Sequence, residues 1–263
     1  MAEVEREFAA TVAEKGMRDG FLEYIADNGI LFAPGAVNGR EYYLARERRP
    51  GLLSWAPEFS EVTCSDLGWT TGHWEFRRDP TMESAAAIGH YITIWRKQTD
   101  DSWKFVLDIG VSYDSQYTRP AELTASSTVC HHVEGDVSSS DAADDLREFE
   151  RQFSTDCSTN GAAAAYRARI SEDVRLYRDG IQPLVGAEAA LSRLSTENNA
   201  GEWRVTDAGV SACGSLGYTY GIDALSDSAG EFFSFTRIWR RGARGGWFLA
   251  LEVQIPRPAP FEK

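Results

Sequence analysis

Basic side chains are few in this 263-residue sequence. It contains 27 Lys and Arg against 40 Asp and Glu, which gives a net charge of −13 at pH 7. A protein of that charge repels phosphate backbones and anionic membrane surfaces. No apolar run reaches about 18 residues, the length that a membrane-spanning helix needs. We therefore expect neither nucleic acid nor a membrane as a partner.

Cysteine and familiar catalytic motifs are scarce as well. The four cysteines show no C-x-x-C spacing and are too few for a disulfide scaffold in a chain of this length. Cys130, His131 and His132 are adjacent, so on an extended chain they point in opposite directions and predict no zinc site. A phosphate-binding loop, a nucleophile elbow and an HExxH motif are all missing from the sequence. We expect no metal and no cofactor.

A leader peptide is not visible either. Residues 1–16, MAEVEREFAATVAEKG, alternate charged and small apolar residues as a helix does. The expected location is the cytoplasm, or an exported compartment if a removed leader preceded this segment.

An internal repeat is the most informative feature that is present. DLGWTTGHWEF, which begins at Asp66, and SLGYTYGIDAL, which begins at Ser215, are nearly the same text. Other matches follow in the same order along both halves: Phe8 with Phe153, Gly16 with Gly161, Phe21 with Tyr166, Ile25 with Ile170, Trp55 with Trp203, IWRK with IWRR, and Asp108 with Glu252. Ordered landmarks of this kind predict a tandem duplication.

A polar stretch divides the two copies. Residues 115–145 lack aromatic side chains after Tyr117 and show no sustained apolar period. We expect a first domain over residues 1–118, a polar linker over 119–144, and a second domain over 145–263.

Each copy has helical patterns first and strand patterns afterwards. In the first copy, the apolar spacing predicts helices over 4–16, 17–29 and 39–49, with a short strand over 30–39. From residue 58 onward the pattern alternates and is rich in β-branched and aromatic residues, which predicts three long antiparallel strands joined by hairpins at 78–84 and 98–102. The predicted class is α+β.

These elements, with FAPGAVNGREYY, DLGWTTGHWEFR and GHYITIWRKQTDDSWKFVLDIG, resemble the nuclear transport factor 2-like superfamily, which includes ketosteroid isomerases, polyketide cyclases and scytalone dehydratase. More narrowly, they resemble its bacterial SnoaL-like branch, whose members are largely of unknown function. The resemblance covers both halves and implies two tandem cone-shaped domains, each with N-terminal helices packed on a curved antiparallel sheet around a pocket. It also implies that the two halves pack as an intramolecular pseudo-dimer, which a further homodimer could double.

Candidate site residues come from strand geometry, because side chains two apart share a face of a sheet. His73 and Glu75 share one face of the first long strand. Symmetric hairpins would place Tyr91 opposite His73 and Asp108 opposite Tyr91. In such a row a neutral histidine can act as a base, a carboxylate can orient it, and a phenol can donate to a developing enolate. We interpret His73, Tyr91 and Asp108 as candidate catalytic residues.

Trp55, Glu75 and His90 are the candidate ligand-binding residues beside that row. A core role fits the tryptophan as well, because buried aromatic side chains dominate packing in any domain. His73, Glu75 and Asp108 fit a solvated polar face equally well, and a register shift of one residue would dissolve the row.

The expected function is binding of a small hydrophobic ligand in the pocket of the N-terminal domain. The alternative is a cofactor-free isomerase, dehydratase or cyclase that transfers a proton on a small apolar substrate. The second copy has Ile222, Asp223 and Ala224 where the first has HWE, and Phe235 where the first has Tyr91. We therefore expect the first domain to hold the site and the second to serve as a scaffold.

Overall fold

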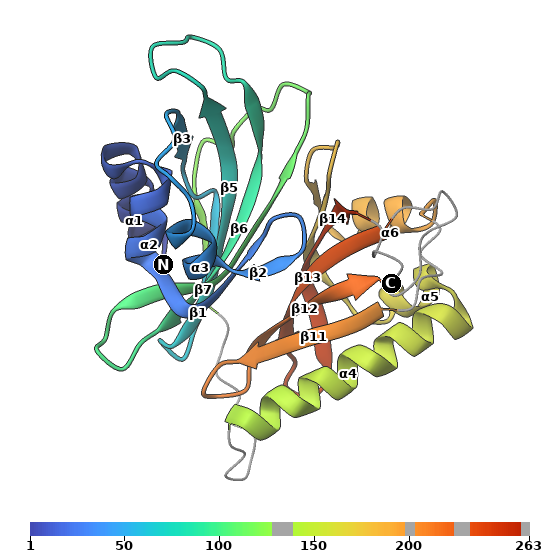
Figure 1. Ribbon diagram of the computed structural model, residues 1–263. Helices are drawn as coiled ribbons and strands as arrows, with labels where there is room; N and C mark the ends of the chain where they lie inside the picture. The colour runs from blue at the N-terminus through green and yellow to red at the C-terminus, as the bar shows by residue number, and fades with distance from the viewer. Residues whose placement is uncertain (128–138, 198–202, 224–231, 259–263) are drawn as a thin grey trace, which may run out of the picture. The chain divides into compact units, whose positions relative to one another are not determined.

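The computed structural model describes residues 1–127, 139–197, 203–223 and 232–258 (Figure 1). The chain divides into two compact units, Met1–Thr128 with Gly180–Gln182, and Val129–Asp179 with Pro183–Lys263. We call them the N-terminal and C-terminal domains. The cysteine and two histidines at 130–132 lie outside the described residues. In the described part of the chain, no helix is long and apolar enough to cross a membrane.

The N-terminal domain is built from helices packed against a curved sheet (Figure 1). Its elements are α1 (Ala2–Lys15), α2 (Met17–Tyr24), β1 (Ile25–Phe32), β2 (Ala36–Asn38), α3 (Gly39–Leu44), β3 (Leu52–Trp55), β4 (Phe59–Thr63), β5 (Leu67–Arg77), β6 (Ala87–Lys97), β7 (Trp103–Ser112) and β8 (Thr124–Ser127). The strand order is β2-β1-β7-β6-β5-β4-β8, and β3 pairs with β5. Neighbouring strands are antiparallel except for the parallel pairs β1–β7 and β4–β8.

Apolar side chains of the first two helices fix them to the sheet. Phe8 of α1 packs edge-on against Trp95, and its ring lies 5.5 Å from that of Phe105. Phe21 of α2 packs edge-on against the same Phe105. Gly16 joins the two helices at a φ of 83°, a conformation that costs glycine little. Each of these buried aromatic side chains contributes roughly 1.5–3 kcal/mol.

The C-terminal domain repeats this arrangement. Its elements are α4 (Ser139–Asn160), α5 (Ala162–Arg167), β9 (Ile170–Arg178), β10 (Leu184–Val185), α6 (Ala187–Leu194), β11 (Trp203–Val210), β12 (Leu216–Asp223), β13 (Phe232–Arg241) and β14 (Trp247–Arg257). The strand order β10-β9-β14-β13-β12-β11 matches β2-β1-β7-β6-β5-β4 of the first sheet. The predicted α+β class, with N-terminal helices on a curved and mainly antiparallel sheet, is confirmed.

Residues matched between the halves of the sequence also occupy matching positions in the two sheets. The central cross-strand rows are Thr70–Thr93–Asp108 in the N-terminal sheet and Thr219–Arg237–Glu252 in the C-terminal sheet. We call residues at the same position in these ladders equivalent.

Several of the predicted elements have different boundaries. The strand predicted over 30–39 is two strands, β1 and β2, and the helix predicted over 39–49 ends at Leu44. The second helix ends at Tyr24, and the chain continues as β1 because it pairs in parallel with β7. The first long strand is two strands, β4 and β5, joined by a tight turn. Cys64 and Ser65 in this turn have φ values of 48° and 56°, left-handed conformations that reverse the chain direction.

The polar segment 119–144 is only partly a linker. It contains β8, which pairs with β4, and it includes the first turns of α4. Ala142 and Ala143 of that helix are buried in the C-terminal core. Small polar residues hid both elements, because neither segment has a clear apolar period.

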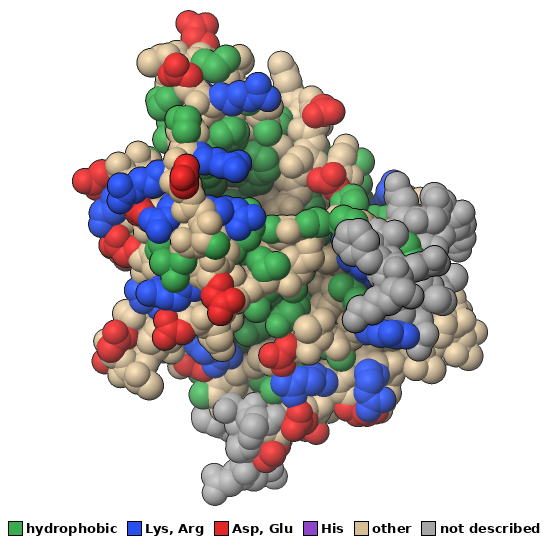
Figure 2. Space-filling view, in the orientation of Figure 1, with side chains coloured by type: hydrophobic (Ala, Val, Ile, Leu, Met, Phe, Trp, Pro, Cys, Tyr) green, Lys and Arg blue, Asp and Glu red, His purple; other side chains and the backbone are tan. Residues whose placement is uncertain are grey.

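Charged side chains of both signs are interspersed on the face of the molecule drawn in Figure 2. The excess of acidic residues is not gathered there into one acidic patch.

Candidate functional site

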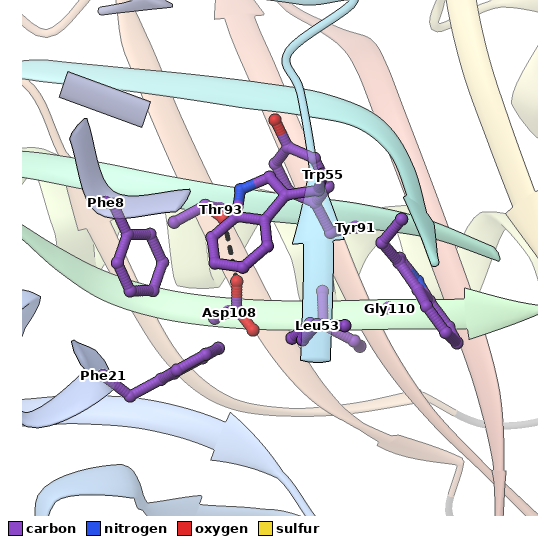
Figure 3. A pocket seen from close by; sticks show the side chains of 10 residues that line it. Phe8, Phe21, Leu53, Trp55, Tyr91, Thr93, Asp108 and Gly110 are labelled. Atoms are coloured by element: carbon purple, nitrogen blue, oxygen red, sulfur yellow. Dashed lines mark hydrogen bonds between the residues drawn. The ribbon is translucent and has the colours of Figure 1, made fainter. Parts of the chain in front are cut away.

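A cavity of about 220 Å³ lies in the N-terminal domain, bounded by the first two helices, β3 and the central strands (Figure 3). Its lining is mainly aromatic and aliphatic, and consists of Phe8, Phe21, Leu53, Trp55, Trp74, Tyr91, Thr93, Asp108, Ile109 and Gly110. Asp108 is the single carboxylate in this lining. Ligand pockets usually have this composition, an apolar wall with a few polar groups that fix the orientation of the ligand.

Asp108 is placed by β7 and held by its neighbour on β6. Thr93 Oγ1 donates a hydrogen bond of 2.8 Å to Asp108 Oδ2, which Figure 3 marks with a dashed line. The other oxygen, Oδ1, has no hydrogen-bond partner among the described residues. Burial raises the pKa of Asp108 to about 6, although the bond from Thr93 works in the opposite direction. The carboxyl group can therefore exchange a proton close to neutral pH.

A second carboxyl group, Glu5 of α1, is fully buried behind the cavity wall. Its oxygens accept hydrogen bonds from Trp55 Nε1 at 2.5 Å, from Trp95 Nε1 at 2.9 Å and from Thr70 Oγ1. Burial raises the pKa of Glu5 to about 7, against the effect of these bonds, and the negative charge of Asp108 raises it further. Within the described residues, neither Glu5 nor Asp108 forms an ion pair.

Three of the residues predicted from sequence meet at this cavity. Trp55, Tyr91 and Asp108 all line it. The rings of Trp55 and Tyr91 pack edge-on with their centroids 6.2 Å apart. In Figure 3 the Trp55 ring and the Asp108 carboxylate face each other across the space.

The predicted catalytic row was wrong in register. His73 lies opposite His90 instead of Tyr91, Tyr91 lies opposite Gly110, and Asp108 lies opposite Thr93. The first hairpin pairs Phe76 with Ala87, which sets its register. The second is symmetric about residues 98–102 next to its loop, and a register shift between Ile94 and Trp95 then offsets β7 by one residue. A one-residue slip moves a side chain to the other face of a sheet.

His73, Glu75 and His90 consequently lie on the sheet face away from the cavity. Tyr113 joins the two histidines, because its hydroxyl lies 2.9 Å from His73 Nδ1 and 2.8 Å from His90 Nδ1. Burial and the charge of Arg119 lower the pKa of His73. This His–Tyr cluster is buried, and the cavity is closed off from it by the sheet itself.

The remaining members of that face are held by ion pairs and hydrogen bonds. Glu75 accepts from Arg77 at 2.6 Å and from Arg119 at 3.2 Å. Glu58 lies 3.1 Å from His90 Nε2 and accepts from Tyr117 at 2.8 Å. Burial alone would raise the pKa of Glu58, but these two contacts lower it.

Glu5 is the site residue that the sequence interpretation missed. A signal was available, because Glu5 and Glu150 differ by the same offset as Phe8 and Phe153, which already marked the repeat. Residues three apart lie on one face of a helix, so each glutamate is expected beside its phenylalanine. The candidate site residues were taken from the strands and the residue Trp55 beside them, so the glutamates of the helices were not considered.

The C-terminal domain has an arginine where the N-terminal domain has its cavity. Arg237, equivalent to Thr93, is fully buried. Its Nε donates to Glu252 Oε2 at 2.6 Å, and its Nη1 donates to Glu150 Oε1. Burial alone would raise the pKa of Glu252, but the charges of Arg237 and Arg178 lower it to about 2. Glu252 is therefore ionised throughout the ordinary pH range.

Aromatic rings surround the same guanidinium. Its central carbon lies 4.4 Å from the ring centroid of Trp203 and 4.5 Å from that of Phe235. These two residues are equivalent to Trp55 and Tyr91 of the cavity lining. The residues that contact the guanidinium of Arg237 are thus equivalent to residues that line the N-terminal cavity.

The chain is similar to solved structures of nuclear transport factor 2-like and ketosteroid isomerase-like proteins. A ketosteroid isomerase-like protein from Erwinia carotovora atroseptica is 13% identical with a TM-score of 0.36, over 44% of this chain and 96% of its own. An NTF2-like protein of unknown function from Pseudomonas putida is 17% identical with a TM-score of 0.37, over 48% of this chain and 92% of its own. No protein-family model and no curated protein matches the sequence. What the site binds has to be inferred from its geometry.

Proposed function

We propose that the N-terminal cavity binds a small molecule with an apolar body. The observation that carries this proposal is the wall of aromatic and aliphatic side chains around one carboxylate, Asp108. The C-terminal domain is then a scaffold, because its equivalent space holds its own Arg237. A site of this kind orients its ligand through the carboxylate and gains affinity by removing apolar surface from water.

Proton transfer on the bound molecule is the second candidate function. Asp108 favours it, because its pKa of about 6 and its Oδ1 at the cavity suit a general base or acid near neutral pH. The ring of Tyr91 lines the same cavity, but its hydroxyl is buried and does not face the bound molecule. Such an enzyme would be a cofactor-free isomerase, dehydratase or cyclase. His73 has no part in this version, since it lies on the opposite face of the sheet.

Ligand binding can be tested with one pair of neighbouring substitutions on β3. Leu53 lines the cavity and Leu52 does not, although both side chains are partly exposed. Ligands would be sought by screening small apolar molecules for quenching of tryptophan fluorescence. Leu53→Trp should lower the affinity of a bound molecule at least tenfold, and Leu52→Trp should change it less than twofold. Equal effects of the two substitutions would refute binding in this cavity.

Turnover can be tested on the same molecules. Asp108→Asn keeps the shape of the side chain and removes its ability to take a proton. If the protein is an enzyme, this change should lower kcat by at least a hundredfold, in line with the usual contribution of general base catalysis. A ligand that binds wild-type protein and is recovered unchanged after prolonged incubation would count against the enzyme and leave binding intact.

A further inference from the structure

The two domains differ at one central position in a way that indicates what the cavity accepts. Thr93 and Arg237 occupy the same place on equivalent strands, between equivalent neighbours. The arginine side chain extends beyond the length of a threonine and ends in a planar cation. Thr93, in contrast, lines the cavity.

The surroundings of that volume are alike in the two domains. Both have a tryptophan, a second aromatic ring and a carboxylate on the neighbouring strand: Trp55, Tyr91 and Asp108 in one domain, and Trp203, Phe235 and Glu252 in the other. Both also have a glutamate from the first helix, with matching hydrogen bonds from a threonine and a tryptophan. Aromatic faces and carboxylates are the groups that recognise cations in proteins.

The charge balance is where the domains diverge. In the C-terminal domain, Glu150 and Glu252 share Arg237, and Glu252 also pairs with Arg178 at 2.5 Å. In the N-terminal domain, the described residues supply no cation to Glu5 or Asp108, and the pKa of each is raised by burial. The N-terminal site therefore has the anionic half of an ion pair and a space where the cationic half would fit.

We infer that the N-terminal cavity binds an organic cation, a guanidinium or amidinium group on a small apolar body, with the cation between Trp55 and Asp108. This inference rests on the proposed function and specifies its ligand. Asp108 Oδ1 is the acceptor that faces the cation. Both oxygens of Glu5 already accept hydrogen bonds, so Glu5 does not contact the cation directly. The apolar body contacts the far end of the lining, at Leu53 and Trp74.

A contrast at the tryptophan explains why only Asp108 meets the cation directly. Trp55 Nε1 donates to Glu5 Oε1, the oxygen equivalent to the one that Arg237 binds in Glu150. In the C-terminal domain the arginine takes that oxygen, and Trp203 Nε1 has no hydrogen-bond partner among the described residues. The cation of an N-terminal ligand would therefore pair directly with Asp108 alone, whereas Arg237 pairs with both Glu150 and Glu252.

Benzamidine and benzamide provide a matched pair of probes, because they have nearly the same shape and only the first is a cation at neutral pH. Binding would be followed by tryptophan fluorescence and by calorimetry on the full chain. Benzamidine should bind at least tenfold more tightly than benzamide, and Asp108→Asn should remove that preference. Leu53→Trp should weaken both probes if they occupy the cavity.

The pH dependence gives a second readout. The titratable side chains around the cation among the described residues are Glu5 of α1, Tyr43 of α3, Tyr91 of β6 and Asp108 of β7. A cation binds the ionised carboxylate, so benzamidine affinity should rise as the pH increases through about 6, the pKa of Asp108. Benzamide affinity should stay constant or fall over the same range.

Thr93→Arg supplies the cation covalently and serves as the second variant. It should fold, lower the pKa of Asp108 and abolish benzamidine binding. A folded Thr93→Arg protein that binds benzamidine as wild type does would overturn the inference. So would benzamide binding as tightly as benzamidine, and in that case ligand binding in the cavity would stand. If neither probe nor any molecule of the apolar screen binds, both the inference and the proposed function fail.

Discussion

The centres of the two domains contrast within one fold. The C-terminal domain buries Arg237 between Glu150 and Glu252, so its charges are paired and its interior is filled. The N-terminal domain has equivalent carboxyl groups, Glu5 and Asp108, beside a cavity. The equivalent carboxyl groups are thus part of a structural core in the C-terminal domain, where Arg237 of the chain itself supplies the positive charge. In the N-terminal domain, no such residue fills the space, and they form a candidate site.

The difference reverses one expectation about the second copy. A duplicate that needs no site is expected to replace buried polar groups by apolar ones, because an apolar replacement is often neutral or stabilising. The C-terminal domain instead has a buried carboxyl group at both equivalent positions, Glu150 and Glu252, and pairs them with Arg178 and Arg237. In this domain the charged side chain of Arg237 lies among the residues whose equivalents line the N-terminal cavity.

The largest effect is expected from breaking the buried ion pairs of the C-terminal domain. Arg237→Met leaves two buried carboxylates without their shared cation and should lower the free energy of unfolding by about 3–5 kcal/mol. Urea unfolding followed by circular dichroism would measure the change. Arg244→Met, in an exposed turn, is the control and should change stability by less than about 0.5 kcal/mol. Equal stability of the two variants would mean that the ion pairs do not hold this domain together.

Acidity should affect the two domains in opposite directions. The folded-state pKa of Glu5, about 7, and that of Asp108, about 6, lie above the ordinary values of 4.5 and 3.8. Stability from these groups is complete below the ordinary values and is lost as the pH rises through 6 and 7, by on the order of 3 kcal/mol for each. Glu252 has a lowered pKa of about 2, so its contribution is complete above 4.5 and is lost as the pH falls toward 2.

Unfolding curves at a series of pH values would test this contrast. Glu5→Gln and Asp108→Asn should each flatten the loss of N-terminal stability between about pH 4 and pH 7, the range from the ordinary to the raised pKa values. Loss of stability in both domains over the same pH range would contradict the assignment of unpaired and paired carboxyl groups.

A smaller effect is expected on the sheet face that carries the His–Tyr cluster. Tyr113→Phe removes the hydroxyl that contacts both His73 and His90, and should lower the free energy of unfolding by about 1–3 kcal/mol. The same change should leave the affinity of a cavity ligand within twofold, because the sheet separates the two sites. Affinity that falls with Tyr113→Phe while stability is unchanged would return the histidines to the functional site.

The fold class could be predicted from the sequence because the two halves repeat the same landmark residues in the same order. A glycine or tryptophan at one position is weak evidence, but Trp55 and Trp203 at matching places in two halves support each other. The predictions that were wrong concern segments where pairing with a distant strand decides the structure. Residues 25–29 have a helical pattern in the sequence, but they form part of β1 because they pair with β7.

The site was only half predictable for a related reason. Tyr91, Asp108 and Trp55 were selected correctly as residues that share a location, since all three line the cavity. His73 and His90 were not separable from them, because strand alternation defines two faces without saying which faces the helices. Only the register of the hairpins decides this, and loop length alone does not determine it.

The smallest effect concerns a cap that one domain has and the other lacks. Asn38 Oδ1 accepts from the Glu41 backbone N–H at 2.9 Å at the start of α3, whereas α6 begins after Gly186 with no side-chain cap. Asn38→Ala should lower the stability of the N-terminal domain by about 1 kcal/mol, because it leaves a helix N–H without its acceptor. Asn28→Ala, at an exposed position of β1, is the control and should change stability by only a few tenths of that. Since α3 packs against β1, and β1 pairs with the cavity strand β7, an Asn38→Ala effect on ligand affinity larger than on stability would show that the cap positions the site as well as the helix.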